Sequence, residues 1–341
     1  LGVSMTACDD WTDPKSIDLD YGTVESADPA AYAKYLDNLR AYRAKPHKKI
    51  YAWFNNADKA IGSQGDRISA LPDSIDVIVL TSPESLTNQM IAEIAKVQAE
   101  KGMEVLISVG FNDIQSEYTA LCEELAEQRI AFEGNPDNEG LDIPAELLNP
   151  TFAEFAAGAF SKKLAYLSVG VDGIMTGFDG KWTSHLTPSQ LAEYNAQANA
   201  YLGVLADFYA RNKDMVFDFI GKPQNIADYP VLADFRMIML SESQAAQDVN
   251  MYTFYYSGVQ GIVDDAKLGL VADFRAIDTN EDAKTGFFTD GSLAIDGLAT
   301  WTAAHNVGAA GVYNVQNDYY VSHGTYEAIR RFIQIINPAA K

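Results

Sequence analysis

The sequence predicts an α/β protein, a single-domain (β/α)8 TIM barrel in which helices surround eight parallel strands. Two observations lead to this fold class. Short and mostly continuous apolar runs alternate with longer amphipathic stretches, as expected for strands that are buried on both faces. There are eight such runs, the number that closes this kind of barrel. The chain has 341 residues, 48% of them hydrophobic, and single barrels of this type routinely reach that length.

The strands are expected where the apolar runs lie. They occupy residues 49–55, 75–81, 104–111, 170–177, 215–220, 235–240, 269–277 and 309–315. Each run is short enough for a strand and is followed by polar or turn-forming residues.

The helices are expected where apolar residues recur at helical spacing. The first begins at Asp28, a good N-cap, with Pro29 in the first helical position. The others are expected at residues 87–101, 151–168, 187–211, 291–305 and 325–336. Residues 112–150 are expected to form a long, turn-rich insert near the mouth of the third strand, where loops build the site of such barrels.

The N-terminal segment differs in composition from the rest. An apolar start, small residues and then Cys8 resemble the end of a bacterial lipoprotein signal peptide, in which the cysteine becomes lipidated. The acidic residues after Cys8 resemble the tether of surface-exposed lipoproteins in Gram-negative bacteria. We therefore expect residues 1–27 to be a signal remnant, lipidated cysteine and flexible tether of an outer-membrane lipoprotein at the cell surface. Residues 28–341 would form the barrel. The alternative is an ordinary N-terminus with a chance cysteine.

The charge and the metal-ligand residues exclude several classes of function. The net charge of -22 repels phosphate groups, so nucleic acids and anionic membranes are poor partners, whereas neutral sugars are unaffected. Two cysteines, Cys8 and Cys122, and four scattered histidines show no zinc-ligand spacing. No metal and no cofactor are expected.

The fourth strand carries the most specific pattern. Residues 171–179 read VDGIMTGFD and resemble D-G-x-D-x-D-x-E, the signature of glycoside hydrolase family 18. Asp172 and Gly173 match the signature. Met175 and Gly177 stand where the family has acids, and Asp179 stands in place of the final glutamate.

Weaker similarities in the same order extend over residues 28–338. Residues 108–111 resemble the S-x-G-G of the family's third strand. Residues 38–42 with 51–54, and residues 311–319, resemble parts of its bacterial endo-β-N-acetylglucosaminidase members.

The resemblance implies a glycan ligand and a weakened catalytic centre. In the family the glutamate protonates the glycosidic oxygen, and the acid two positions earlier orients the substrate acetamide, whose oxygen attacks the anomeric carbon. Because those acids are replaced or shortened here, we expect a surface glycan-binding protein that captures N-acetylglucosamine-containing glycans for a glycan-uptake complex. The alternative is a weakly active endo-β-N-acetylglucosaminidase-type hydrolase that uses Asp179 as its acid. A third, weaker interpretation is a scaffold that contacts another protein.

The residues expected to bind the oligosaccharide follow the strand ends. Aromatic rings stack on sugar faces, and amides and carboxylates bond to hydroxyl groups. The candidates are Trp53, Asn55, Phe111, Asn112, Asp179, Trp182, Glu242, Gln316, Asn317 and Tyr319. Trp53 and Phe111 could equally be core residues, and Glu242 could be an ordinary loop charge.

Overall fold

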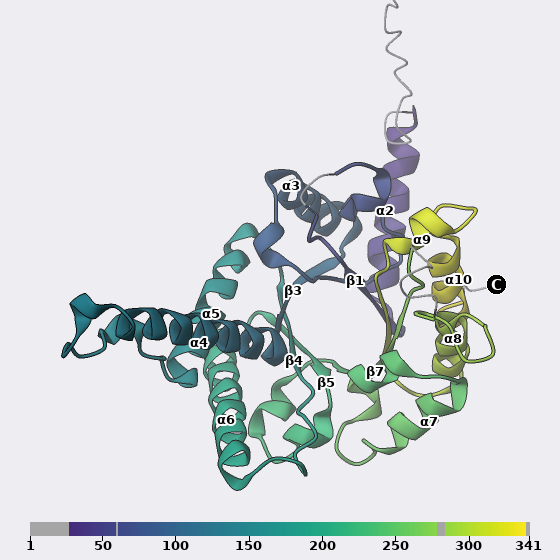
Figure 1. Cartoon of the computed structure of the whole chain (residues 1–341). Helices are drawn as coiled ribbons and strands as arrows, with labels where there is room; N and C mark the ends of the chain where they lie inside the picture. Colours follow the sequence, from purple (N-terminus) through teal and green to yellow (C-terminus); the bar gives the residue numbers. More distant parts are fainter. Residues whose placement is uncertain (1–26, 59–60, 278–283, 339–341) are drawn as a thin grey trace, which may run out of the picture.

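The computed structural model describes residues 27–58, 61–277 and 284–338. Eight parallel strands follow one another around a closed barrel in chain order, and β1 pairs with β8 to complete the ring (Figure 1). The predicted fold class is therefore confirmed. Cys8 and most of the expected tether lie outside the described residues. Within the described residues, no helix is long and apolar enough to cross a membrane.

All eight expected strands are present, with ends that shift by at most a few residues. They are β1 (Lys49–Phe54), β2 (Val77–Leu80), β3 (Glu104–Gly110), β4 (Gly173–Phe178), β5 (Val216–Gly221), β6 (Ile238–Leu240), β7 (Leu268–Asp273) and β8 (Ala309–Tyr313).

The helices pack around the barrel. They are α2 (Pro29–Arg43), α3 (Asn88–Lys96), α4 (Phe111–Glu133), α5 (Phe152–Leu164), α6 (Pro188–Arg211), α7 (Val249–Ser257), α8 (Ala294–Ala304), α9 (Asn317–Val321) and α10 (Glu327–Ile336). The expected cap of α2 is confirmed, because the Asp28 carboxylate accepts a hydrogen bond from the amide of Ala31 at 2.9 Å.

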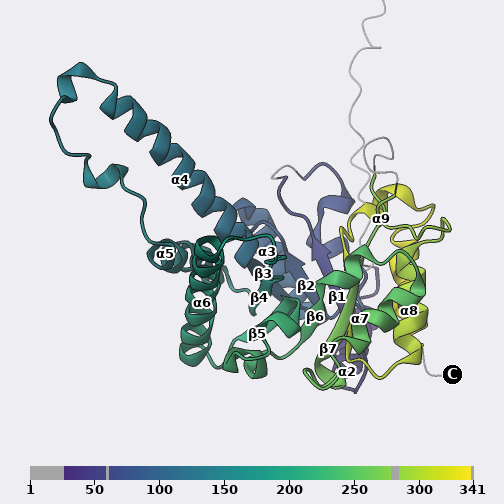
Figure 2. The same ribbon diagram turned by 60° about the horizontal axis from the view of Figure 1, so that its bottom comes forward.

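The expected insert at 112–150 is in large part a helix, which corrects the sequence interpretation. Helix α4 has 23 residues and projects away from the barrel, and its turn-rich continuation lies at the far end (Figure 2). Only Phe111, Ile114 and Leu125 are buried along α4. A projecting helix needs no continuous apolar stripe, so the periodicity that identifies a packed helix is weak here.

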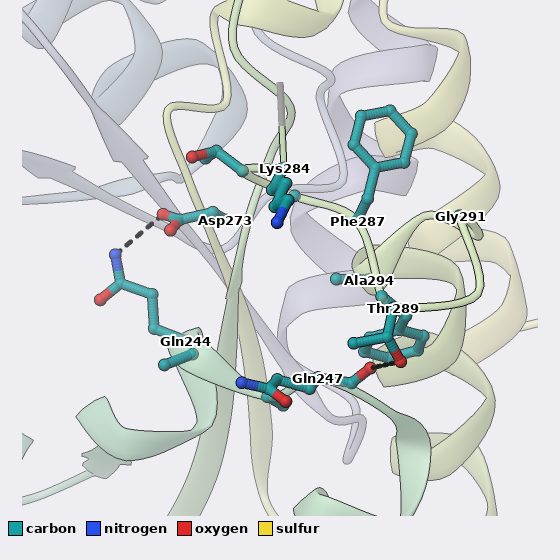
Figure 3. Close-up of a pocket in the computed structure, with 13 residues that line it drawn as sticks. Gln244, Gln247, Asp273, Lys284, Phe287, Thr289, Gly291 and Ala294 are labelled. Carbon is teal, nitrogen blue, oxygen red and sulfur yellow. Dashed lines mark hydrogen bonds between the residues drawn. The ribbon is translucent and has the colours of Figure 1, made fainter. Parts of the chain in front are cut away.

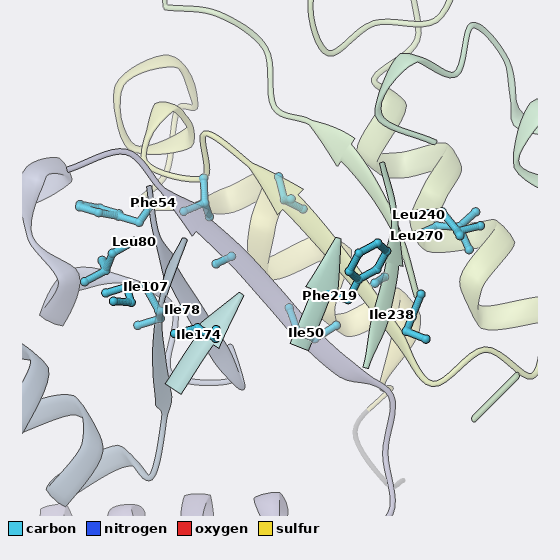
Figure 4. Packing of buried hydrophobic residues seen from close by; sticks show 14 of the residues in the cluster. Ile50, Phe54, Ile78, Leu80, Ile107, Ile174, Phe219, Ile238, Leu240 and Leu270 are labelled. Carbon is cyan, nitrogen blue, oxygen red and sulfur yellow. The ribbon is translucent and has the colours of Figure 1, made fainter. Parts of the chain in front are cut away.

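The barrel has two apolar layers, because successive side chains of a strand point to opposite faces. One face packs outward against the helices, with residues such as Ile78, Ile107 and Ile174 (Figure 4). The other face fills the barrel. Its buried members are Tyr51, Trp53, Val77, Val79, Leu106, Met175, Met237, Met239, Val271 and Ala309. The interior is thus a packed core that closes the floor of the mouth.

Candidate functional site

The candidate site lies at the carboxyl ends of the strands, where a parallel barrel gathers the loops that follow every strand. On β4, Met175 is fully buried inside the barrel and Gly177 lies one inward position higher, opposite Gly110 of β3. Asp179 follows directly after the strand. The inward side of β4 therefore presents one carboxylate to the mouth.

Asp179 is held by neighbours from three other parts of the chain. The Ser241 hydroxyl donates a hydrogen bond to one carboxylate oxygen, and the Asn112 amide donates to the other at 3.4 Å. The Asn225 side chain donates to the backbone carbonyl of Asp179 at 2.6 Å. The structure thus brings together Asn112 and Asp179, two of the predicted site residues, and adds Ser241.

An aromatic pair forms part of the floor. Trp53 of β1 stacks on Tyr313 of β8, with ring centroids 4.6 Å apart and planes 16° from parallel. Trp53 is 1% exposed, whereas Tyr313 keeps some exposure. Gly311 makes room for the indole, because a Cβ there would stand 2.5 Å from a Trp53 ring carbon. Trp53 therefore supports the floor, and Tyr313 is the ring of the pair that a ligand could reach.

The hydroxyl of Tyr313 lies close to negative charge. Burial raises the pKa of Tyr313, and the charges of Asp273 and Asp179 raise it further. The phenol therefore stays protonated at physiological pH and can donate a hydrogen bond.

A second carboxyl group, Asp113, borders this centre from the first turn of α4. Its Oδ2 lies 3.4 Å from the position that a Cβ on Gly110 would occupy, and Gly110 is paired with Gly177. Although the side chain keeps contact with solvent, burial raises the pKa of Asp113, and the Lys163 charge opposes the rise. Sequence reasoning missed Asp113 because it did not foresee that a helix begins at residue 111, and the first turn of that helix brings Asp113 back beside Gly110.

Several other predicted site residues line the rim of the mouth. Glu242 forms an ion pair with Lys222 at 2.9 Å and accepts a hydrogen bond from Gln224 at 3.0 Å, so it is tied between the ends of β5 and β6. The Gln316 side chain accepts from the amide of Asn55 at 3.3 Å. These three contacts order the rim.

The remaining predicted residues have different surroundings. Asn317 donates to the carbonyl of Arg275 at 3.1 Å, and the Tyr319 ring packs against Tyr326. Trp182, after β4, is 77% exposed.

Phe111 lies outside the mouth, which corrects its candidacy as a sugar contact. It is 1% exposed, and its ring packs against Phe178 and Tyr201 with centroids 4.9 and 5.4 Å away. As the first residue of α4, Phe111 turns outward into the layer between strands and helices. It anchors the base of the projecting helix.

Sequence reasoning also missed a pocket beside the centre, at the ends of β6 and β7. Its side chains include Gln244, Gln247, Asp273 and Thr289 (Figure 3). The sequence could have indicated Asp273 as a site residue, because this aspartate ends the apolar run LGLVAD much as Asp179 follows the fourth strand. Among the described residues, no group of three or more histidine, cysteine or acidic side chains could hold a metal ion.

Comparison with known proteins places this architecture in a family. The model of "Glycoside hydrolase family 18, BT1044-like" matches residues 12–335. Among curated proteins, none matches the chain at a significant level.

Solved structures share the fold at low sequence identity. A BT1044 structure is 15% identical, covers 93% of this chain and 96% of its own, and has a TM-score of 0.57. An endo-β-N-acetylglucosaminidase from Cordyceps militaris is also 15% identical, with 89% and 96% covered and a TM-score of 0.55. A mutant of that enzyme in complex with fucosyl-N-acetylglucosamine-Asn has a TM-score of 0.53 at 15% identity, with 89% and 95% covered. These structural likenesses show the fold, and the match over residues 12–335 shows that the chain belongs to glycoside hydrolase family 18, as a BT1044-like member.

Proposed function

We propose that this chain is a glycan-binding member of its family that captures N-acetylglucosamine-containing oligosaccharides without efficient cleavage. The observation that carries the proposal is the inward face of β4. Met175 is apolar and fully buried, and Gly177 has no side chain to orient an acetamide. Asp179 is shorter than the family's glutamate, and a displacement of about 1 Å from the productive geometry can cost about 100-fold in rate.

The remaining features of the mouth suit binding. Both oxygens of the Asp179 carboxylate accept hydrogen bonds from protein groups, so the carboxylate is oriented as an acceptor for a ligand hydroxyl or amide as well. Tyr313 offers a ring, and Trp182 is an exposed aromatic side chain on the adjacent loop. One structural neighbour holds fucosyl-N-acetylglucosamine-Asn, which supports an N-acetylglucosamine-containing ligand for this chain.

Weak hydrolysis is the second candidate, and Asp113 is the observation that favours it. Asp113 lies beside Gly110, which pairs with Gly177, so its carboxyl group stands near the place of a missing acid. Burial raises the pKa of Asp113, so its carboxyl group is easier to protonate than that of an ordinary aspartate. In this alternative Asp179 serves as the acid, and the carboxyl group of Asp113 partly replaces the missing acid beside it.

The test measures binding and cleavage in parallel. The chain without residues 1–8 is titrated calorimetrically with chitobiose and with the trimannosyl-chitobiose pentasaccharide, and long incubations are analysed by mass spectrometry. Binding without products is expected, and Asp179→Asn should weaken it. Products that disappear in Asp179→Asn and in Asp113→Asn would establish the hydrolase instead. A folded chain that binds neither sugar would contradict the proposal.

The cellular location is part of the same proposal. A lipid on Cys8 would hold the barrel at the outer membrane, and the tether would present its mouth to extracellular glycans for an uptake complex. The protein is expressed with a full lipoprotein signal peptide in a Gram-negative host that is fed an alkyne fatty acid. The protein should then carry the alkyne label. The label should be absent from the Cys8→Ser variant, and equal labelling of both would disprove the anchor.

A further inference from the structure

We propose that the pocket at the ends of β6 and β7 is a second sugar subsite, which takes a neutral pyranose of the same oligosaccharide that binds at Asp179. The inference rests on the proposed glycan-binding function. The pocket has a volume of about 820 Å³, within the roughly 300–1,000 Å³ that is usual for small-molecule sites. We call it the β6–β7 pocket. Its chemically informative side chains are Gln244, Gln247, Asp273, Lys284, Phe287 and Thr289.

One short segment of chain contributes to both the β6–β7 pocket and the Asp179 centre. The 3-10 helix Ser241–Ala245 begins with the serine that bonds to Asp179 and carries Gln244 into the pocket. On the other side, Asp273 is the register partner of Tyr313. A single oligosaccharide can therefore contact both places.

The wall of the pocket is held in shape before any ligand arrives. Gly286 has φ +78°, and a Cβ there would lie 2.5 Å from the backbone nitrogen of Arg275, so the loop passes closely over the end of β7. Thr289 donates to the carbonyl of Gln247 from its amide at 3.0 Å and from its hydroxyl at 3.2 Å. A fixed wall lowers the entropy lost on binding.

The side chains match the hydrogen-bonding pattern of a sugar ring. Gln244 donates to Asp273 at 2.8 Å, which orients an amide oxygen and a carboxylate as acceptors for hydroxyl groups (Figure 3). The hydrogen bonds described for Gln247 use its backbone, so its exposed side-chain amide is available as donor and acceptor. Phe287 adds apolar surface for the C–H face of a ring.

The charges favour a neutral sugar. Asp273 lines the pocket and the whole chain carries -22, so an acidic sugar would be repelled. Lys284, the cation among the described lining residues, is exposed and offers donors to hydroxyl groups.

The experiment separates this subsite from the Asp179 centre by ligand length. Calorimetry measures the affinities of chitobiose and of the trimannosyl-chitobiose pentasaccharide for the wild-type chain and two pocket variants. Gln247→Ala removes a side-chain amide, and Ala245→Trp fills the pocket from an exposed position. Gln334→Ala, an exposed glutamine on α10, is the matched control.

We expect the pocket variants to reduce the difference in affinity between the pentasaccharide and chitobiose. Both pocket variants should weaken the pentasaccharide about tenfold, or about 1.4 kcal/mol, relative to chitobiose. Asp179→Asn should weaken both ligands, and Gln334→Ala neither. If the folded pocket variants bind the pentasaccharide as tightly as wild type, the subsite is wrong while the glycan-binding function stands. If wild type binds neither ligand, both proposals fail.

Discussion

Asp179 and Asp76 show how differently single carboxylates are used in this barrel. Asp179 faces the mouth and accepts hydrogen bonds from the side chains of Ser241 and Asn112. Asp76, before β2, lies at the opposite end and is 5% exposed. It accepts hydrogen bonds from Arg43 at 2.8 Å, from His47 at 2.9 Å and from the amide of Ile50 at 2.8 Å. The first carboxylate is available to a ligand, whereas the second joins α2 to the barrel.

The contact between His47 and Asp76 predicts a pH-dependent part of the stability. The hydrogen bond to Asp76 raises the pKa of His47, burial opposes the rise, and the charge of Asp76 adds to it. The protonated form is thus favoured in the folded state. The stability that this contact contributes to the fold is fully present below the unfolded pKa of His47, about 6.5. It is lost as the pH rises through the higher folded pKa.

We therefore expect His47→Gln to lower the melting temperature more at about pH 5.5 than at about pH 8.5. Calorimetric melting at both pH values measures this difference. His323→Gln, at an exposed position, serves as the control and should melt like wild type at both. An equal loss at both pH values in His47→Gln would contradict the assignment.

At the scale of elements, the pairing of β4 with β5 depends on a glycine. A Cβ on Gly173 would stand 1.9 Å from the carbonyl oxygen of Val216, so any side chain must push the two strands apart. The family signature has a glycine at this place, and the structure supplies a packing reason for it. The strand that carries Asp179 is positioned by this close approach.

Gly173→Ala should therefore destabilise the fold by about 3 kcal/mol, near the upper end of the usual cost of overpacking. Gly158→Ala is the matched control, because nothing lies within 4 Å of its Cβ position in α5. That control should stabilise the helix by about 0.5–1 kcal/mol. Urea unfolding measures both, and a Gly173→Ala variant as stable as wild type would show that β4 and β5 adjust without cost.

At the scale of the whole molecule, a polar network towards the amino-terminal ends of the strands ties the barrel together. Tyr51 and Asp218 in it are buried, whereas the side chains of Arg236 and Glu104 are each 31% exposed. Arg236 pairs with Asp218 of β5 at 2.7 Å and with Glu104 of β3 at 2.7 Å. Tyr51 of β1 donates to Asp218 at 2.7 Å. Asp218 is fully buried, so its charge depends on these partners. Three strands far apart in sequence meet in this one network.

Arg236→Leu should cost about 3–5 kcal/mol of unfolding free energy, because it leaves the buried Asp218 without its counter-charge. The matched control is Arg331→Leu, whose pair with Asp296 has both side chains about 40% exposed. Breaking that exposed pair should cost about 0–1 kcal/mol. Chemical unfolding measures both variants, and equal effects would mean that the network adds little to barrel closure.

The amino-acid pattern located the strands more accurately than the residues of the site. The run at 309–315 marked β8 almost to the residue, because a strand buried on both faces needs continuous apolar side chains. The strand expected at residues 104–111 was extended one residue too far, because Phe111 is the first residue of α4. The alternation along β3 already gives Phe111 the outward parity of Val105, Ile107 and Val109, so its ring belongs to the outer layer of the core.

What the sequence by itself determined is the part that depends on local pattern. This part comprises eight buried strands, their order with most of the helices, and the strand that Asp179 follows. The tertiary structure decided which loops meet above the barrel. Ser241 reaches Asp179 across 62 residues of chain, and Gln244 reaches Asp273 across 29. Such contacts depend on barrel closure and on the path of each loop. Neither leaves a periodic trace in the amino-acid order.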